Sequence, residues 1–289
     1  MNALTEYDRL ISVVVKHVRD AFVDAQTIAA QWKRLNYTAP PDLPRAIDEH
    51  DRFIDLLRSS GATVHELPRD SETTLDSIYV RDASIVSPAG SILCAMGKAE
   101  RATEPAAQAK AFDGFGGAIA GRITPPGTLE GGDLIWLDED TLAVGRGYRT
   151  NAEGVRQLRA LVGASVEVIE VPLPHWHGQG DVMHLMSLIS PIDRDLAVVY
   201  SRLLPVPFRE WLLEREMRFV EVPDEEFETM GTNVLALAPR RCLMLTGNPL
   251  TRRLLEQSRC EVLEYEGSEI SVKGAGGPTC LTRPLVRAS

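Results

Sequence analysis

Short apolar segments and amphipathic stretches alternate along the chain with a regular period. Alternating or continuous apolar runs that are bounded by turn residues are typical of β-strands. Five such β-rich segments, each following a helix-like stretch, begin near Gly61, Gly117, Gly163, Glu216 and Arg259. The pattern therefore predicts one structural unit about every 50 residues, and a repeat of this kind organises a whole fold.

Each of the first four β-rich segments is followed by two apolar runs joined by a short polar turn. These pairs begin at Asp76, Gly131, Gly180 and Gly231, and turns such as DED and IDRD have the size of hairpin connections. The fifth pair is incomplete at the C-terminal end, and the apolar strand LISVVVKHV near the N-terminus would complete it. The sequence therefore predicts a closed ring, which leaves no sheet edge exposed.

Helix-like stretches lie between the hairpins. Four of them combine start signals with an amphipathic pattern: PRAIDEHDRFIDLLRSSG, NAEGVRQLRALVGA, PVPFREWLLEREM and NPLTRRLLEQ. No Gly/Ser-rich linker or low-complexity run divides the 289 residues. We therefore expect one α/β domain over residues 1–289, built from about five modules of helix, strand, loop, strand, turn and strand.

Composition and charge narrow the classes of function. The chain has 31 Lys and Arg residues against 41 Asp and Glu, and its net charge of −10 argues against a nucleic-acid-binding surface. Its four cysteines form no CxxC pair, so their spacing fits neither a disulfide scaffold nor a zinc ribbon. The N-terminus lacks a secretory pattern, and no stretch approaches the ~18 apolar residues of a membrane span. We expect a soluble cytoplasmic protein with reduced thiols, which binds neither nucleic acid nor membrane.

Loops at one end of such a ring converge on its axis, so polar residues at the hairpin starts are candidates for function. Cys280 lies in KGAGGPTCLTRPL, where three glycines would let the backbone approach a ligand closely. A free cysteine is more often buried and inert. Because of the glycines, both a reactive thiol and an inert one remain open for Cys280. The other three cysteines fall within apolar strand patterns and are expected in the core.

His184 is the histidine best placed for chemistry, in the apolar segment GDVMHLMSL. A lone histidine in a strand is usually a core or surface residue, but a pairing with a thiol would give the Cys–His arrangement of nucleophilic catalysis. His175 and His177, in PHWHGQG, could join His184 as metal ligands, but this spacing is a weak zinc signal. The sequence therefore favours a Cys280–His184 pair without a metal.

Charged residues near these positions admit two interpretations. The segment EGGD, Glu130 to Asp133, is either a tight turn with surface carboxylates or a carboxylate pair that neutralises a cation or orients the histidine. Arg101, Arg146 and Arg149 lie in predicted loops, where arginines are mostly solvated, although one or two could grip a carboxylate.

Together these segments resemble a known superfamily. VRDAS, LEGGD with VGRGYRTNAEG, GDVMHLMS and the Gly-rich TC occur in the order found in the guanidino-group-modifying, or pentein, superfamily, which includes arginine deiminases, amidinotransferases and dimethylarginine dimethylaminohydrolases. The resemblance implies a five-module pseudo-symmetric α/β propeller and is greatest to the dimethylarginine hydrolases. Met186 stands where arginine deiminases usually carry Asp and these hydrolases commonly Lys, and Arg81 stands where many hydrolases carry an acid.

The resemblance also implies a covalent mechanism. Cys280 would attack the guanidinium carbon to form an S-alkylthiouronium intermediate. His184 would protonate the departing amine and then activate water. Glu130 would orient His184, and the products would be citrulline and an alkylamine. Neither a metal nor an organic cofactor is required, although zinc could inhibit by binding Cys280 and His184.

Substrate contacts are implied for five further side chains. Asp82, with Glu130, would bind the guanidinium nitrogens of Nω,Nω-dimethylarginine or monomethylarginine. Arg101 and Arg149 would hold the α-carboxylate, and Asp76 would lie near the α-amino group. Asp133 would add negative charge facing the cation. We expect the loop from Val23 to Asn36 to cover the site.

Two other functions remain open at this point. A deiminase or amidinotransferase acting on another guanidine would use the same residues with a different leaving group or acceptor. A non-catalytic, ribosome-binding propeller of this superfamily would lack the Cys–His–carboxylate set. The expected partner is a small guanidino compound, and a homodimer is left open.

Overall fold

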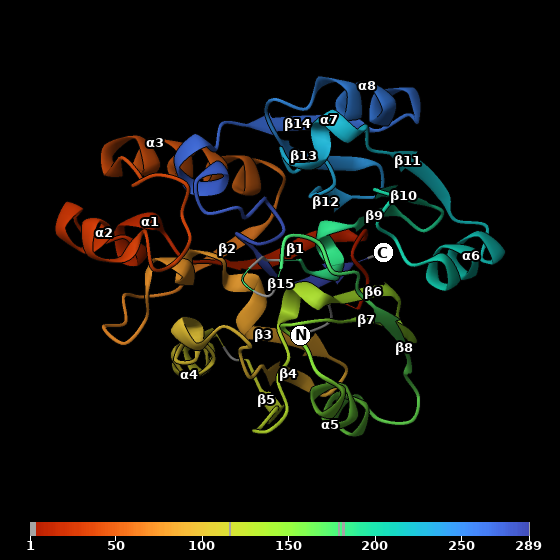
Figure 1. The fold of residues 1–289 in the computed structure, drawn as a ribbon, viewed down its shortest axis with the longest axis horizontal. Helices are drawn as coiled ribbons and strands as arrows, with labels where there is room; N and C mark the ends of the chain where they lie inside the picture. The colour runs from red at the N-terminus through yellow and green to blue at the C-terminus, as the bar shows by residue number, and fades with distance from the viewer. Residues whose placement is uncertain (1–3, 116, 179, 181–182, 289) are drawn as a thin grey trace.

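The computed structural model describes residues 4–115, 117–178, 180 and 183–288. Within these residues, five three-stranded sheets are arranged around a central axis like the blades of a propeller, with helices on the outside (Figure 1). The five-module α/β propeller predicted from the repeat is therefore confirmed.

Four sheets share one construction: an antiparallel hairpin, a crossover helix, and a third strand that pairs in parallel with the hairpin's second strand. The four blades are β3 (Ser84–Ser87), β4 (Gly90–Leu93), α4 (Glu104–Phe112) and β5 (Ile119–Arg122); β6 (Leu134–Asp138), β7 (Thr141–Arg146), α5 (Ala152–Val162) and β8 (Glu167–Pro172); β9 (Ile189–Asp193), β10 (Leu196–Val199), α6 (Val206–Glu214) and β11 (Arg218–Glu221); and β12 (Leu235–Ala238), β13 (Arg241–Leu245), α8 (Pro249–Gln257) and β14 (Glu261–Tyr265). The sequence analysis groups each helix and its strand with the hairpin that follows them, whereas the structure groups them with the hairpin before them. Each helix and its strand complete the hairpin that precedes them, because a crossover helix returns the chain parallel to the strand it leaves.

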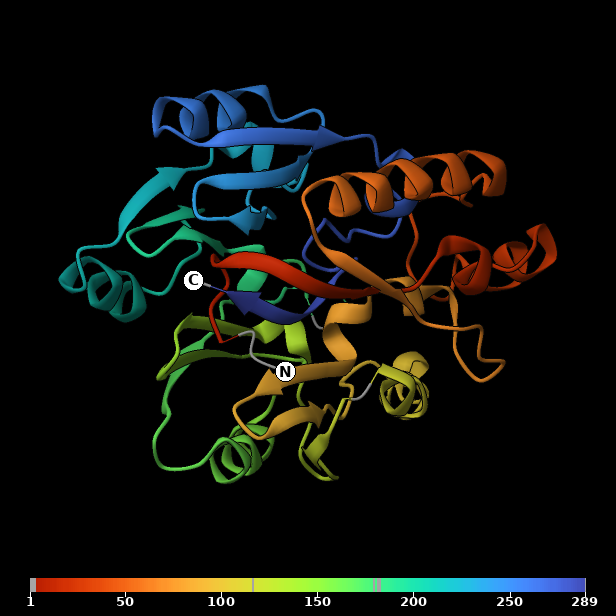
Figure 2. The same cartoon turned by 180° about the vertical axis from the view of Figure 1, so that it is seen from behind.

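The fifth sheet closes the ring with the two ends of the chain. Strand β1 (Arg9–Val15) pairs antiparallel with β15 (Arg283–Ala288) and parallel with β2 (Thr63–Glu66), which follows the long helix α3 (Leu43–Ser59). Figure 2 shows β1 and β15 lying side by side. The closing role predicted for the N-terminal strand is confirmed.

Two of the four predicted helices begin at a residue whose side chain caps them. The Asp42 side chain accepts a hydrogen bond from the Arg45 backbone at the start of α3, and Asn151 does the same for Gly154 at the start of α5. Three short helices lie outside this scheme: α1 (Val18–Ala21), α2 (Ala25–Gln31) and α7 (Asp224–Phe227). Helix α2 occupies half of the segment from Val23 to Asn36 that was expected to be a covering loop. Of the described residues, none belongs to a helix that is long and apolar enough to cross a membrane.

Two segments expected to be strands are short 3₁₀ helices instead. The chain from Asp76 to Asp82 forms the turns Leu75–Ile78 and Val80–Ala83, and His184 immediately precedes the turn Leu185–Ser187. A third turn, Gly131–Asp133, precedes β6. Apolar residues fill these turns, since Leu75, Ile78, Val80 and Leu185 are fully buried, and this explains why the apolar run resembled a strand. The turns carry the polar side chains toward the axis.

Candidate active site

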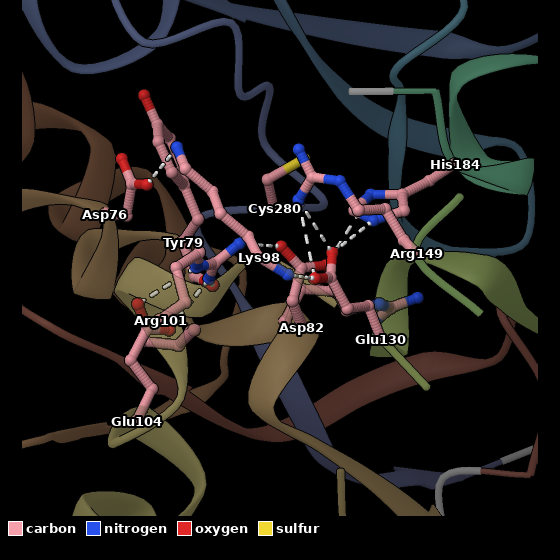
Figure 3. Close-up of polar contacts among 12 residues, drawn as sticks. Asp76, Tyr79, Asp82, Lys98, Arg101, Glu104, Glu130, Arg149, His184 and Cys280 are labelled. Carbon is pink, nitrogen blue, oxygen red and sulfur yellow. Dashed lines mark hydrogen bonds and ion pairs between the residues drawn. The ribbon is translucent and has the colours of Figure 1, made fainter. Parts of the chain in front are cut away.

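The predicted functional residues gather in one place, although they come from four of the five modules. Figure 3 shows Asp82, Glu130, His184 and Cys280 facing a common centre. A cavity of about 110 Å³ at this centre is lined by charged and polar side chains, by glycine-rich backbone before Cys280, and by the end of the segment that follows α2: Leu35, Asn36, Asp76, Tyr79, Asp82, Lys98, Arg101, Arg149, Gly180, His184, Gly274, Ala275, Gly276 and Cys280.

His184 lies between two buried carboxylates. Its Nε2 is 2.8 Å from Glu130 Oε2, and its Nδ1 is 3.8 Å from Asp82 Oδ1. Burial alone would disfavour the imidazolium, but the charges of Asp82 and Asp133 and the hydrogen bond to Glu130 outweigh it and raise the pKa of His184 to about 9. His184 is therefore a protonated acid at neutral pH.

Glycine at position 132 makes this approach of His184 and Asp82 feasible. A Cβ atom built on Gly132 would lie 2.4 Å from His184 Nδ1 and 2.7 Å from Asp82 Oδ1. Both distances are far inside van der Waals contact, and neither partner is free to move in a buried site. The second glycine of EGGD is therefore required by the site rather than by a hairpin turn.

Glu130 remains ionised although it is completely buried. Burial would raise its pKa, but the hydrogen bond and charge of His184 and the charge of Arg149 hold the pKa of this carboxyl well below its usual range. Arg149 Nη1 lies 3.2 Å from Glu130 Oε2 and 3.4 Å from Oε1. A guanidinium is thus already held against this carboxylate.

Asp133 lies beneath the cavity and is not among the residues that line it. Its oxygens accept hydrogen bonds from Thr150 Oγ1 at 2.6 Å and from the Leu185 backbone at 3.1 Å. Burial raises its pKa to about 6. Asp133 therefore tethers the turn that follows His184 and acts on the imidazole through its charge.

Cys280 is half-buried, and its thiol lies beside Asn233, whose Nδ2 is 3.5 Å from Sγ. Asn233 Oδ1 also accepts hydrogen bonds from Thr279, so the amide orientation is fixed. A Cβ on Gly277 would fall 2.4 Å from Asn233 Oδ1, which explains a glycine three residues before the cysteine. Burial and the charge of Asp82 raise the pKa of the Cys280 thiol.

Arg101 is committed to protein partners. It contacts Asp82 at 2.5 Å, the Tyr79 carbonyl at 2.8 Å, and both oxygens of Glu104 at 2.9 and 2.8 Å. Arg101 lines the cavity, but its N–H groups donate to these partners and thereby fix the position of the Asp82 side chain. Glu104, at the start of α4, was not among the predicted residues, and its only sequence signal is its position three residues after Arg101.

Asp76 is paired with Lys98, a second residue that was not predicted from the sequence. Lys98 Nζ lies 2.6 Å from Asp76 Oδ2 and 2.9 Å from the Leu35 carbonyl, and the backbone N–H of Lys98 donates to Glu130 Oε1 at 3.0 Å (Figure 3). The signal that could have found it is a lysine three residues before Arg101, at the end of an apolar strand.

The remaining candidates lie elsewhere. Arg81 is buried and pairs with Glu6 at 2.6 Å, outside the cavity. His175 contacts the Tyr148 hydroxyl, and His177 lies 3.4 Å from Glu228, so neither joins His184. Among the described residues, one group could hold a metal ion: Asp82, Glu130 and His184, with ligand atoms within 4.8 Å of one another. A metal ion bound there would have to displace the proton of His184.

Comparison with known proteins agrees with this geometry. A family model described as "N,N dimethylarginine dimethylhydrolase, eukaryotic" matches residues 26–287. The chain is 31% identical over 240 residues to an N(G),N(G)-dimethylarginine dimethylaminohydrolase of Streptomyces coelicolor, which covers 82% of this chain and 84% of that protein. It is 26% identical to an arginine deiminase of Mycobacterium marinum, over 85% of this chain and 74% of that protein.

A solved structure has the same fold. DDAH from Pseudomonas aeruginosa, in complex with citrulline, superposes with a TM-score of 0.76 at 22% identity, covering 95% of this chain and 99% of that one. At this identity the likeness concerns the fold alone.

Proposed function

This chain belongs to the N,N-dimethylarginine dimethylhydrolase family, a hydrolase family within the pentein superfamily, and we propose that it hydrolyses an alkyl-substituted guanidine through a covalent bond to Cys280. Nω,Nω-dimethylarginine and monomethylarginine are the reference substrates. The products would be a ureido compound, citrulline for these substrates, and an alkylamine.

One observation carries the proposal: the thiol of Cys280, the imidazolium of His184 and the carboxylate of Asp82 line one small cavity. Asp82 Oδ1 is buried and has no hydrogen-bond partner among the described residues. A buried acceptor of this kind is costly unless a ligand satisfies it. The N–H groups of a guanidinium would do so, and the guanidinium of Arg149 already lies beside the neighbouring carboxylate of Glu130.

The order of proton transfers follows from the pKa of His184. When the substrate binds, the Cys280 thiol loses its proton to solvent, and the thiolate Sγ attacks the guanidinium carbon. The C–N bond to the alkylamine then breaks while His184 gives its proton to the departing nitrogen. The thiouronium that remains is attacked by water, from which the now neutral His184 removes a proton. Collapse breaks the C–S bond, releases the ureido product and restores the thiol.

The raised pKa of the Cys280 thiol fits a nucleophile that is activated by its substrate. Asp82 disfavours the thiolate in the free enzyme. A cationic guanidinium bound to Asp82 neutralises this charge and adds positive charge beside the sulfur, so that the thiolate forms when the substrate is in place.

The leaving-group side of the site favours an alkylamine over ammonia. A second cavity of about 130 Å³ adjoins Cys280 and His184. The apolar side chains of Met183, Met186 and Phe227 line it together with polar ones, which include His177 and Glu228. A carboxylate at position 186 would hold an unsubstituted nitrogen, whereas the buried Met186 offers only apolar contact. A methyl or larger substituent gains from this surface.

The test is product analysis with Nω,Nω-dimethylarginine, monomethylarginine and arginine. We expect citrulline with dimethylamine or methylamine, and a mass adduct on Cys280 that is absent from Cys280→Ser. Ammonia from arginine as the main product would instead identify a deiminase. Equal behaviour of the wild type and Cys280→Ser on every guanidine would overturn the proposal.

A further inference from the structure

Within the main cavity, a ready-made binding site for an ammonium group is already filled by the protein itself. An ammonium presents three N–H donors and needs acceptors around one point. Asp76 Oδ2 and the Leu35 carbonyl provide two, and both accept from Lys98 Nζ, at 2.6 and 2.9 Å. Figure 3 shows the Lys98 amine reaching Asp76 on the side of the site away from His184.

Lys98 is held at both ends. Its backbone N–H donates to Glu130, which lies under the reaction centre, and its side chain is only 11% exposed. The side chain of Asp76 is 5% exposed, so withdrawal of the lysine would leave a buried carboxylate unpaired. A buried ion pair is strongly destabilised when one partner leaves, so Lys98 is a fixed part of the cavity wall.

A second ammonium has no place beside this pair. An α-amino group brought to Asp76 would meet the Lys98 ammonium within a few ångströms, in a site of low dielectric where like charges repel strongly. A carboxylate meets the opposite situation, since the Lys98 ammonium attracts it and retains one N–H donor. Arg101 cannot take part in the same way, because its donors are on Asp82, Glu104 and Tyr79.

We propose that Lys98 makes this enzyme selective for guanidino carboxylates that carry no ammonium group beside the carboxylate, such as 5-guanidinopentanoate skeletons. The inference rests on the proposed function and names its substrate class. The substrate guanidinium lies against Asp82, whose Oδ1 has no hydrogen-bond partner among the described residues, and the distal carboxylate lies near Lys98. Nω,Nω-dimethylarginine then remains a substrate, but a poorer one than its desamino analogue, 5-(N′,N′-dimethylguanidino)pentanoate.

The experiment compares kcat/KM for these two compounds in the wild type, Lys98→Ala and Lys98→Met. We expect the wild type to prefer the desamino analogue by at least about tenfold, since sites built around a charge discriminate steeply. Both variants should lose this preference, with a gain on dimethylarginine. Methionine retains most of the lysine stem, so Lys98→Met separates charge from packing. Lys110→Ala, which removes an exposed lysine paired with Asp70, is the matched control.

A binding measurement keeps the two proposals apart. The dissociation constants of arginine and 5-guanidinopentanoate are measured on Cys280→Ser, with and without Lys98→Met. If no guanidine is hydrolysed but the desamino compound still binds more tightly because of Lys98, the proposed function fails and the specificity stands. If dimethylarginine is hydrolysed at least as well as its desamino analogue, or if Lys98→Met weakens both compounds equally, the specificity proposal is wrong.

Discussion

At the scale of single residues, the protonation of His184 decides how the site can work. The folded protein raises the pKa of its imidazole from 6.5 to about 9, through Asp82, Asp133 and Glu130 acting against burial. A raised pKa means that the imidazolium stabilises the fold. This contribution is fully present below about pH 6.5 and is lost as the pH rises toward 9.

We predict that the His184 ring titrates near pH 9 in the wild type and at lower pH in Glu130→Gln, as measured by NMR of ring-labelled histidine. The reason is that the amide introduced by this substitution keeps a hydrogen-bonding oxygen but removes the charge. His65, a partly buried histidine that contacts Ser12, provides an internal reference signal that should not change between the two proteins. A ring that titrates near its ordinary value of 6.5 in both would contradict the assigned role of Glu130.

A second prediction concerns Gly132. Gly132→Ala is expected to lower kcat/KM by at least about 100-fold, because the methyl group displaces His184 and Asp82 and misplaced groups lose catalysis steeply. Gly114→Ala is the control, since a Cβ there meets nothing within 4 Å. Equal activity of the two variants would mean that the arrangement around Gly132 is not required.

The residues at the centre of the site could be predicted from the sequence because each lies at a fixed place in the repeat. Asp82, Glu130 and His184 precede hairpins, and Cys280 precedes β15, the strand that pairs with β1. The ring brings these strand starts together (Figure 3). Lys98 and Glu104, the partners of Asp76 and Arg101, could not be predicted from the sequence. Such pairings depend on side-chain positions that no periodic pattern encodes.

At the scale of elements, strand periodicity predicted the strands and failed in the turns before them. A helix-like stretch was expected before Gly117, but the bounds of α4 were not predicted, because EPAAQAKAF is rich in alanine and has only a weak apolar stripe. The 3₁₀ turns that hold the site are buried and apolar on one side, so their composition resembles that of the strands they precede.

Asn151 shows how one element supports the site. Its side chain caps α5 through Gly154 and also joins Thr128 and the Pro126 carbonyl, in the segment that leads to Glu130. We predict that Asn151→Ala lowers the free energy of unfolding by about 1–2 kcal/mol in urea titrations. Asn151→Asp, which can still cap, should recover most of this loss; equal losses in both would show that capping is not the cause.

At the scale of the whole molecule, ring closure depends on the N-terminal segment. Glu6, just before β1, pairs with the buried Arg81, and two further buried arginines of β15, Arg283 and Arg287, lie close to this pair. Burial and the charge of Arg81 lower the pKa of Arg283 to about 9. Glu6 is therefore the carboxylate shared by all three guanidinium groups, while Asp82 also acts on Arg283 and Asp8 on Arg287.

Glu6→Gln should consequently destabilise the protein by about 3–5 kcal/mol, because it leaves a buried guanidinium without a counter-charge. Chemical denaturation measures this loss, and Glu66→Gln, which breaks an exposed pair with Arg58, should change stability little. The deficit should shrink at alkaline pH, where Arg283 loses its proton more readily than an ordinary arginine does. A deficit that is independent of pH would attribute the effect to packing of the N-terminal segment rather than to the charge of Glu6.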